Sequence, residues 1–336
     1  MTSGAKRASA LCAVALVAAL AWHFADRGIE HSDTLRDAVL DLDSRVALRE
    51  RIACEPRVAA SEAIAAGIAP RLDAEARFVW FEGAGPDGRR QVQRFAWRTR
   101  EVECLTCSEP GNNRRPAPHP TARAVLFDTD RFASALRPFD RELMVLTTNP
   151  TQPPHPSRRL TWDAARDTHA LYDPSGLGLA WSRWALAGRT QRALIRFGHG
   201  SISLGSPATL ARGGFGSARP LAWSPDARSF VVATAGDTRL VDFAGDSRTL
   251  GSEHVAFSAD GTLVARAEAS AEGTRVVLGE ARGDTREVAL GELAAWGAPA
   301  GIALAPDGEA FALAQTRAGE ERISWAQLDC AAPAAP

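Results

Sequence analysis

The sequence has 336 residues, a formal net charge of -1 and 24% charged residues. This length allows about two ordinary domains or one large all-β domain. Hydrophobic residues make up 45% of the chain, so most of the chain can bury a core and disorder is excluded for it. The balanced charge argues against a nucleic-acid partner, which would need a basic face.

The first 25 residues have the pattern of an export signal. Lys6 and Arg7 precede an apolar stretch that runs from residue 8 to residue 21. A short positive segment followed by roughly 7–15 apolar residues is typical of secretory signals. Ala19-Leu20-Ala21 is a small-x-small cleavage site, so residues 1–25 are either a cleaved signal peptide or a retained signal anchor helix. We expect the rest of the chain on the periplasmic face of the inner membrane, or free in the periplasm after cleavage.

Residues 26–54 are predicted to be an amphipathic helical linker. Within it, Ser32 can cap a helix over residues 32–53, and Leu35, Val39, Leu42 and Val46 recur at helical spacing. We expect this apolar stripe to dock on the following domain, with a short coiled coil as the alternative.

The C-terminal half contains a repeated strand–turn–strand pattern. The three turn segments are Leu221-Ala-Trp-Ser-Pro-Asp226, Val255-Ala-Phe-Ser-Ala-Asp-Gly261 and Ile302-Ala-Leu-Ala-Pro-Asp-Gly308, each followed by an apolar strand. In such turns Pro fixes φ, Asp bonds the local backbone and Gly supplies a positive φ. The predicted structural turn residues are Asp226, Asp260, Gly261, Asp307, Gly308 and, by the same pattern, Gly176.

Weaker copies of the pattern occur earlier in the chain, at residues 69–74, 117–122 and 170–176. The matched positions are Leu72, His119, Tyr172, Trp223, Phe257 and Leu304. Their average spacing of about 46 residues is close to that of a four-stranded propeller blade. The sequence therefore predicts an all-β, six-bladed β-propeller over residues 55–330, followed by a disordered tail at 331–336.

The turns have a known counterpart. Together with strands that end in Leu-Thr, at Leu105-Thr106, Leu146-Thr147 and Leu160-Thr161, they resemble the repeats of TolB-like six-bladed β-propellers. The resemblance covers about 260 residues and implies protein partners in the cell envelope. A tryptophan-aspartate repeat propeller is the nearest rival, but Trp162-Asp163 is the one pair of that kind.

The sequence offers no motif for chemistry. The histidines are scattered, no nucleophile elbow or phosphate loop is present, and we predict no catalytic, cofactor-binding or metal-binding residue. The Arg114-Arg115 and Arg158-Arg159 pairs are expected on loops, as a solvated surface or, alternatively, as a contact for an acidic partner. The innermost strands are expected to be mostly apolar, with His119 as the one candidate that titrates near neutral pH.

The cysteines suggest a ring closed by a covalent bridge. The last repeat supplies three strands, so the missing outer strand should come from residues 57–60, because an open ring would leave exposed sheet edges. Antiparallel pairing would then place Cys54 beside Cys330, and we predict a disulfide between them in an oxidising periplasm. Cys104 and Cys107 are left as a local thiol pair or disulfide.

The sequence thus predicts an exported, membrane-tethered β-propeller that is a protein-binding or scaffolding module of a bacterial cell envelope, and not an enzyme. Its partners would be envelope proteins and, through the N-terminal segment, the inner membrane; no nucleic acid is expected. One alternative is a propeller enzyme, or a protein binding a small molecule or carbohydrate, that uses the central channel. Another is a purely structural ectodomain of a membrane complex.

Overall fold

A computed structural model describes most of the chain between residues 55 and 331. The residues not described within this range are 74, 122, 136–139, 149–156, 163–165, 175, 177, 188–189, 200–202, 205–218, 225–228, 234–237, 243–246, 259–260, 262 and 281–284. The predicted signal segment and helical linker, with Cys54, lie outside the described residues, as do Asp226, Asp260 and residues 332–336.

Six four-stranded sheets account for the described strands. The first two sheets consist of β2 (Ile68–Leu72), β3 (Phe78–Ala84), β4 (Arg90–Ala96) and β5 (Glu101–Cys104), then β6 (Asn113–Pro118), β7 (Ala124–Thr129), β8 (Glu142–Thr147) and β9 (Ser157–Arg159). The next two consist of β10 (Arg166–Tyr172), β11 (Gly178–Ala187), β12 (Thr190–His199) and β13 (Ser203–Leu204), then β14 (Arg219–Trp223), β15 (Ser229–Ala233), β16 (Thr238–Asp242) and β17 (Ser247–Thr249).

The fifth sheet consists of β18 (His254–Phe257), β19 (Leu263–Ser270), β20 (Gly273–Glu280) and β21 (Thr285–Val288), and is followed by the 3-10 helix η2 (Gly291–Leu293). The last sheet joins β22 (Ala298–Leu304), β23 (Ala310–Arg317) and β24 (Glu320–Ala331) to β1 (Glu55–Ala65). None of the helices that the structure describes is long and apolar enough to cross a membrane.

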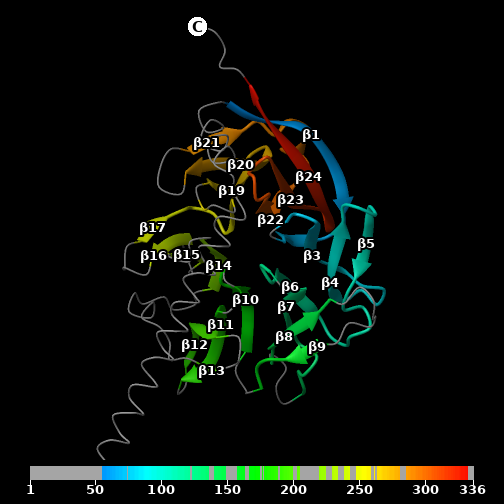
Figure 1. Ribbon diagram of the computed structural model, residues 1–336, viewed down its shortest axis with the longest axis vertical. Helices are drawn as coiled ribbons and strands as arrows, with labels where there is room; N and C mark the ends of the chain where they lie inside the picture. Colours follow the sequence, from blue (N-terminus) through cyan, green and yellow to red (C-terminus); the bar gives the residue numbers. More distant parts are fainter. Residues whose placement is uncertain are drawn as a thin grey trace, which may run out of the picture. The chain divides into compact units, whose positions relative to one another are not determined.

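The sheets form a closed ring. Each sheet contacts the next in chain order, and β22 of the last sheet contacts β2 of the first. Figure 1 shows β6, β10, β14 and β22 towards the centre, with the fourth strand of each sheet at the periphery. The predicted all-β propeller fold is confirmed.

Strands from both ends of the described chain complete the last sheet. β1 pairs antiparallel with β24, in a register that places Glu55 opposite Ala331 and Pro56 opposite Cys330. The predicted closing strand is therefore confirmed, although it is longer than the four residues expected. Because β1 covers the edge of β24, that strand does not expose a row of unpaired backbone groups.

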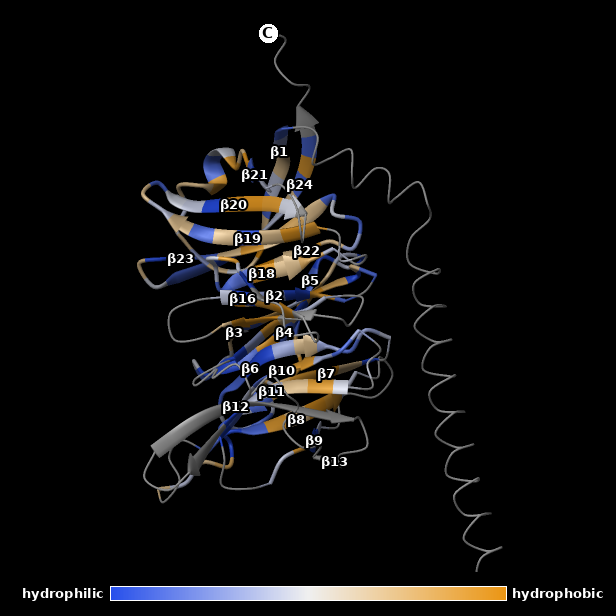
Figure 2. Ribbon diagram, turned by 90° about the vertical axis from the view of Figure 1, so that its left-hand side faces the viewer, coloured by the Kyte–Doolittle hydropathy of each residue, from blue (hydrophilic) through white to orange (hydrophobic). Residues whose placement is uncertain are grey.

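The core lies between successive sheets rather than at the centre of the ring. Val79 and Phe81 of β3 pack with Ala312 of β23, and Trp80 packs on the other side of β3 with Val125 and Phe127 of β7. A strand covered on both faces reads as a continuous apolar run, which explains the short runs seen in the sequence. Figure 2 shows this apolar character along β7 and β20.

The repeated turns have one hydrogen-bond pattern. The backbone N–H of Asp173, Ser258 and Ala305 donates to the carbonyl five residues later, and His119 donates to Ala124 in the same way. His119 therefore corresponds to Asp173 rather than to Tyr172, and the sequence alignment of that repeat was wrong by one residue. The weak turn at residues 119–124, which lacks both Asp and Gly, caused the shift.

Candidate functional site

The two ends of the ring differ in what they present. We call the end that carries the turns between inner and second strands the turn face; it consists of the described residues within 73–78, 119–124, 173–178, 258–263 and 305–310. The start face is the opposite end, formed by the β3–β4 turn at residues 85–89 and by the starts of β6, β10 and β24. Because successive strands run antiparallel, the ends of β3 and β7 also reach the start face.

The predicted turn residues have the expected geometry where the structure describes them. Gly176, Gly261 and Gly308 have φ of 75, 70 and 71°. Gly308 N–H donates to the Ala305 carbonyl at 2.9 Å, and the Asp307 carboxylate accepts from Glu309 N–H at 2.8 Å. These contacts are local to the turn, as in a tight hairpin.

Inner strands near the start face are bulged. The registers of β6 with β7 and of β10 with β11 shift between Arg114 and Ala117 and between Thr168 and Leu171. The bulges hold Arg115 and His169 at φ of 54 and 55°. Ala69 has φ of 53° at the equivalent bulge of β2, so this backbone conformation recurs between sheets, and bulges re-aim side chains.

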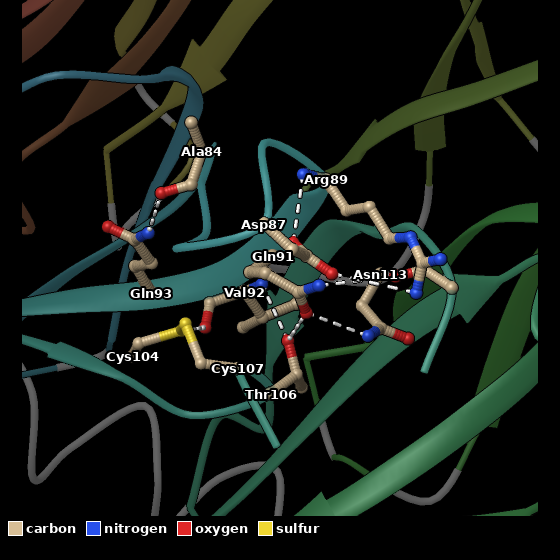
Figure 3. Close-up of a disulfide and its surroundings, with 11 residues drawn as sticks. Ala84, Asp87, Arg89, Gln91, Val92, Gln93, Cys104, Thr106, Cys107 and Asn113 are labelled. Atoms are coloured by element: carbon tan, nitrogen blue, oxygen red, sulfur yellow. Dashed lines mark hydrogen bonds and ion pairs between the residues drawn. A yellow bond between two sulfur atoms is a disulfide. The ribbon is translucent and has the colours of Figure 1, made fainter. Parts of the chain in front are cut away.

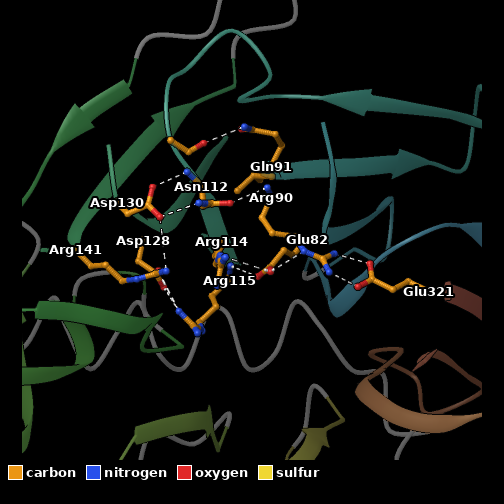
Figure 4. A network of polar contacts seen from close by, with 12 residues as sticks. Glu82, Arg90, Gln91, Asn112, Arg114, Arg115, Asp128, Asp130, Arg141 and Glu321 are labelled. Carbon is orange, nitrogen blue, oxygen red and sulfur yellow. Dashed lines mark hydrogen bonds and ion pairs between the residues drawn. The ribbon is translucent and has the colours of Figure 1, made fainter. Parts of the chain in front are cut away.

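Asp128, near the end of β7, forms ion pairs with two arginines. Arg115 Nη1 lies 3.0 Å from both carboxylate oxygens, and Arg141 Nη1 lies 2.8 Å from Oδ1. The backbone N–H of His169 also donates to Oδ2, at 3.5 Å. The Asp128 side chain is 1% exposed, whereas that of Arg115 is 28% exposed, so the carboxylate is more deeply buried than the guanidinium that contacts it (Figure 4).

Glu82, at the end of β3, is a second recessed carboxylate. It accepts from the backbone N–H of Arg115 at 3.3 Å and lies 3.8 Å from Arg90 Nε and 4.0 Å from Arg114 Nε. Burial raises the pKa of the Glu82 carboxyl, while the charges of Arg115 and Arg114 oppose that shift. Arg90 itself forms a two-pronged ion pair with Glu321 at the start of β24.

Arg166 and His169 of β10 lie near the positive charges of several arginines. Burial and then the charges of Arg141, Arg115 and Arg114 lower the pKa of Arg166, and Asp128 opposes them. Burial holds the pKa of His169 well below its ordinary value, and the charges of four arginines lower it further: Arg115, Arg219, Arg166 and Arg141. His169 Nδ1 lies 2.9 Å from Thr168 Oγ1.

One arginine links distant parts of the ring. Arg71 of β2 donates from Nη2 to the Leu221 carbonyl of β14 at 2.9 Å. β2 and β14 belong to the first and fourth sheets in chain order, so the Arg71 side chain reaches across the centre of the ring. Burial lowers the pKa of this guanidinium.

The local cysteine pair forms a disulfide beside this region. Cys104 and Cys107 are bonded, with their Cα atoms 5.6 Å apart. Between them, Thr106 Oγ1 accepts from Val92 N–H at 2.9 Å and donates to Gln91 Oε1 at 2.7 Å (Figure 3). Gln91 Oε1 also accepts from Asn113 Nδ2 at 2.8 Å, so the bridge supports the segment that leads into β6.

A second Leu-Thr segment, Leu160-Thr161, makes the same kind of hydrogen bonds without a disulfide. Thr161 Oγ1 accepts from Leu143 N–H at 3.0 Å and bonds the Glu142 carboxylate, which also pairs with Arg159. Burial raises the pKa of Glu142, opposed by the hydrogen bonds from Thr161 and Arg159. Leu146-Thr147 is not a third copy, because it ends β8 instead of following an outer strand.

Three expectations for charged residues were wrong. Arg114 and Arg115 lie on β6 and are half-buried, not on a solvated loop. Arg158 and Arg159 lie on β9, and Arg159 pairs with a buried carboxylate. The inner strands are not mostly apolar, because their start-face ends carry arginines and His169. The repeat positions matched in the sequence, from Leu72 to Leu304, all lie at the turn-face ends of these strands. Among the described residues, no group of three potential metal ligands comes together.

Comparison with sequence-family models and with curated protein sequences finds no match. Solved structures are similar in fold. TolB from Acinetobacter baumannii aligns with a TM-score of 0.54 and 13% identity, over 75% of this chain and 64% of that chain. The chain thus spans less than two thirds of that structure.

Two other solved propellers align less closely. The β-propeller domain of Cps50 (Swd1) from Myceliophteria thermophila has a TM-score of 0.46 and 15% identity, over 79% of this chain and 99% of that chain. An oligogalacturonate lyase in complex with manganese has a TM-score of 0.44 and 13% identity, over 78% of both chains. At these identities the similarity concerns the fold.

Proposed function

We propose that the chain is an exported, six-bladed TolB-like propeller, tethered to the inner membrane, that binds a protein partner of the bacterial cell envelope through its start face. The observation that carries the proposal is the arginine cluster built over buried carboxylates at that face. Arginine is enriched at protein interfaces and at their energetic centres. A rigid ring that displays such side chains is suited to recognition.

Two features support the envelope location. The first 25 residues have the pattern of an export signal. The Cys104–Cys107 disulfide would persist in an oxidising compartment such as the periplasm. A reporter fused after Pro336 should be active only if it functions in the periplasm, and activity of a cytoplasm-only reporter would contradict the location.

The ring closure gives a second test of the compartment. Pro56 pairs with Cys330 in the β1–β24 ladder, which brings the chain next to Cys54 to the end of β24. We expect mass mapping of the unreduced protein, isolated from its native compartment, to find a Cys54–Cys330 peptide. Free thiols at both positions would contradict the predicted bridge.

Binding of a protein is tested by affinity purification of the full chain from detergent-solubilised membranes. We expect one envelope protein at a stoichiometric ratio, and its loss when Arg115 and Arg114 are both replaced by Gln. Retention of the same partner by that variant would contradict binding through the start face. Recovery of the folded chain alone would contradict the protein-binding function.

A further inference from the structure

We propose that the start face contains a binding site for an oxyanion group, a carboxylate or a phosphate, formed by Arg114, Arg115, Arg141 and Arg166. The inference rests on the start face being the binding face, as proposed above, and specifies the chemical group that this face recognises. It requires no particular protein as the source of that group.

The first argument is charge. The guanidinium groups of Arg114, Arg115 and Arg141 lie against Glu82 and Asp128, and Asp130 is a third carboxylate, 3.8 Å from Arg141. The charges of Arg141, Arg115 and Arg114 act on Arg166, with Asp128 as the opposing carboxylate. The cluster therefore keeps an excess of positive charge in a half-buried place, where electrostatic interactions are stronger than in bulk water.

The second argument is the arrangement of donors that lack acceptors. Within the described part of the chain, Arg166 forms no ion pair, and its buried Nε has no hydrogen-bond acceptor. Arg114 has one carboxylate near it, Glu82 at 4.0 Å, and its own Nε also lacks an acceptor there. Buried donors normally find partners, so these two arginines have hydrogen-bonding capacity that the described residues do not use.

The third argument is accessibility. The side chains of Arg114 and Arg115 are 30% and 28% exposed, whereas those of Glu82 and Asp128 are 6% and 1% exposed. A ligand arriving from solvent therefore meets guanidinium groups before carboxylates. Planar guanidinium groups bind carboxylates and phosphates in two-pronged geometry, whereas a metal cation would be repelled.

A neighbouring pair shows what a purely structural arginine looks like. Arg90 meets Glu321 with two nitrogens on two oxygens, so its charge is matched within the chain. Arg166 has no such match among the described residues. The difference separates an arginine that holds two sheets together from one that is available to a ligand.

The test is titration calorimetry on the purified full chain in detergent. Sodium phosphate and sodium succinate are titrated separately, with sodium chloride at matched ionic strength as the reference. We expect saturable binding of at least one of the two anions. Binding of phosphate identifies a phosphate group as the ligand chemistry, and binding of succinate alone identifies a carboxylate. Absence of saturable binding of both would overturn the site.

Variants locate the binding. Arg166→Gln should weaken it about tenfold, the value of one charge-assisted contact. The matched control is Arg89→Gln, which removes the same charge from an exposed position on the same face and should change affinity less than about twofold. If Arg166→Gln does not fold, the half-exposed Arg114→Gln replaces it. Equal effects of the cluster and control variants would overturn the assignment.

The two proposals fail separately. Loss of anion binding would remove this site and leave the purification of a protein partner as an independent result. Anion binding without any protein partner would retain the site and contradict the proposed protein-binding function.

Discussion

The turn face and the start face are built from the same described strands but use polar residues differently. On the turn face, the hydrogen bonds of Asp307 and Gly308 within the described part of the chain lie in their own hairpin. On the start face, Asp128 joins Arg115 of β6, Arg141 just before β8, and His169 of β10. The Asp307 turn is therefore stabilised locally, whereas Asp128 also contacts the next sheet; on the turn face such a contact between sheets is made by His119 with the Gly176 carbonyl.

This difference is the basis for proposing the start face as the binding face. Repeated turns must be alike to produce alike hairpins, which leaves little freedom for a specific surface. The bulges at Arg115 and His169 have counterparts in β2, β14 and β22, so the bulge belongs to the repeat. What differs in β6 and β10 is that the bulged residue is charged or titratable, so that these bulges aim such side chains towards the start face.

The largest contrast between the faces is expected from one substitution made on both. Asp128→Asn should lower the free energy of unfolding by about 3 kcal/mol, because it leaves two half-buried arginines without their shared carboxylate. Asp307→Asn should cost less than about 0.5 kcal/mol, since Asn keeps the local hydrogen bond at an exposed turn. Urea unfolding measures both, and equal losses would erase the distinction.

A second experiment separates stability from binding. Gly308→Val should lower the free energy of unfolding by about 2 kcal/mol, because a β-branched residue is strained at positive φ. Gly308→Asn should cost less, since Asn tolerates this conformation. Neither should alter phosphate or succinate affinity in calorimetry. A change in affinity would mean that the turn face takes part in binding.

Removing the Cys104–Cys107 disulfide tests how much this bridge stabilises the segment that leads into β6. Removing it with Cys104→Ser and Cys107→Ser should cost about 2 kcal/mol, the chain-entropy value for so short a loop. Thr161→Val, in the copy that lacks a disulfide, is the comparison, because it leaves Leu143 N–H without its acceptor. If the double variant unfolds at the same urea concentration as the parent, the bridge adds nothing to the support.

The smallest expected effect concerns pH. The folded-state pKa of His169 is lowered, so the folded chain binds fewer protons there than the unfolded chain. Stability from this residue is therefore present above the ordinary histidine pKa and is lost as pH falls below about 6.5, by at most about 1.4 kcal/mol per pH unit.

The test compares a histidine on the start face with one on the turn face. His169→Gln should flatten the fall in unfolding free energy between pH 7.5 and pH 5.5, as followed by urea titrations. His119→Gln on the turn face should flatten it less, because the Gly176 carbonyl and Asp173 oppose the effect of burial on the His119 pKa. A larger effect from His119→Gln would contradict the electrostatics assigned to the start face.

The sequence predicted the parts of the fold that local chemistry determines. Pro-Asp-Gly turns and short apolar runs identified the propeller, and the missing strand of the last repeat located β1. It did not reveal the bulges, because Arg115 and His169 are ordinary residues in a left-handed conformation that no local pattern requires. The contacts of Asp128 and Glu82 with Arg115 join separate strands, and their proximity depends on how the sheets pack.

The central claim is that the start face is the face that binds. A photo-crosslinking amino acid placed at Arg89 on the start face, or at Asp307 on the turn face, tests it in intact cells; both side chains are exposed. We expect a discrete crosslinked species from position 89 and none from position 307. Crosslinking at position 307 alone, or equally at both positions, would contradict the account.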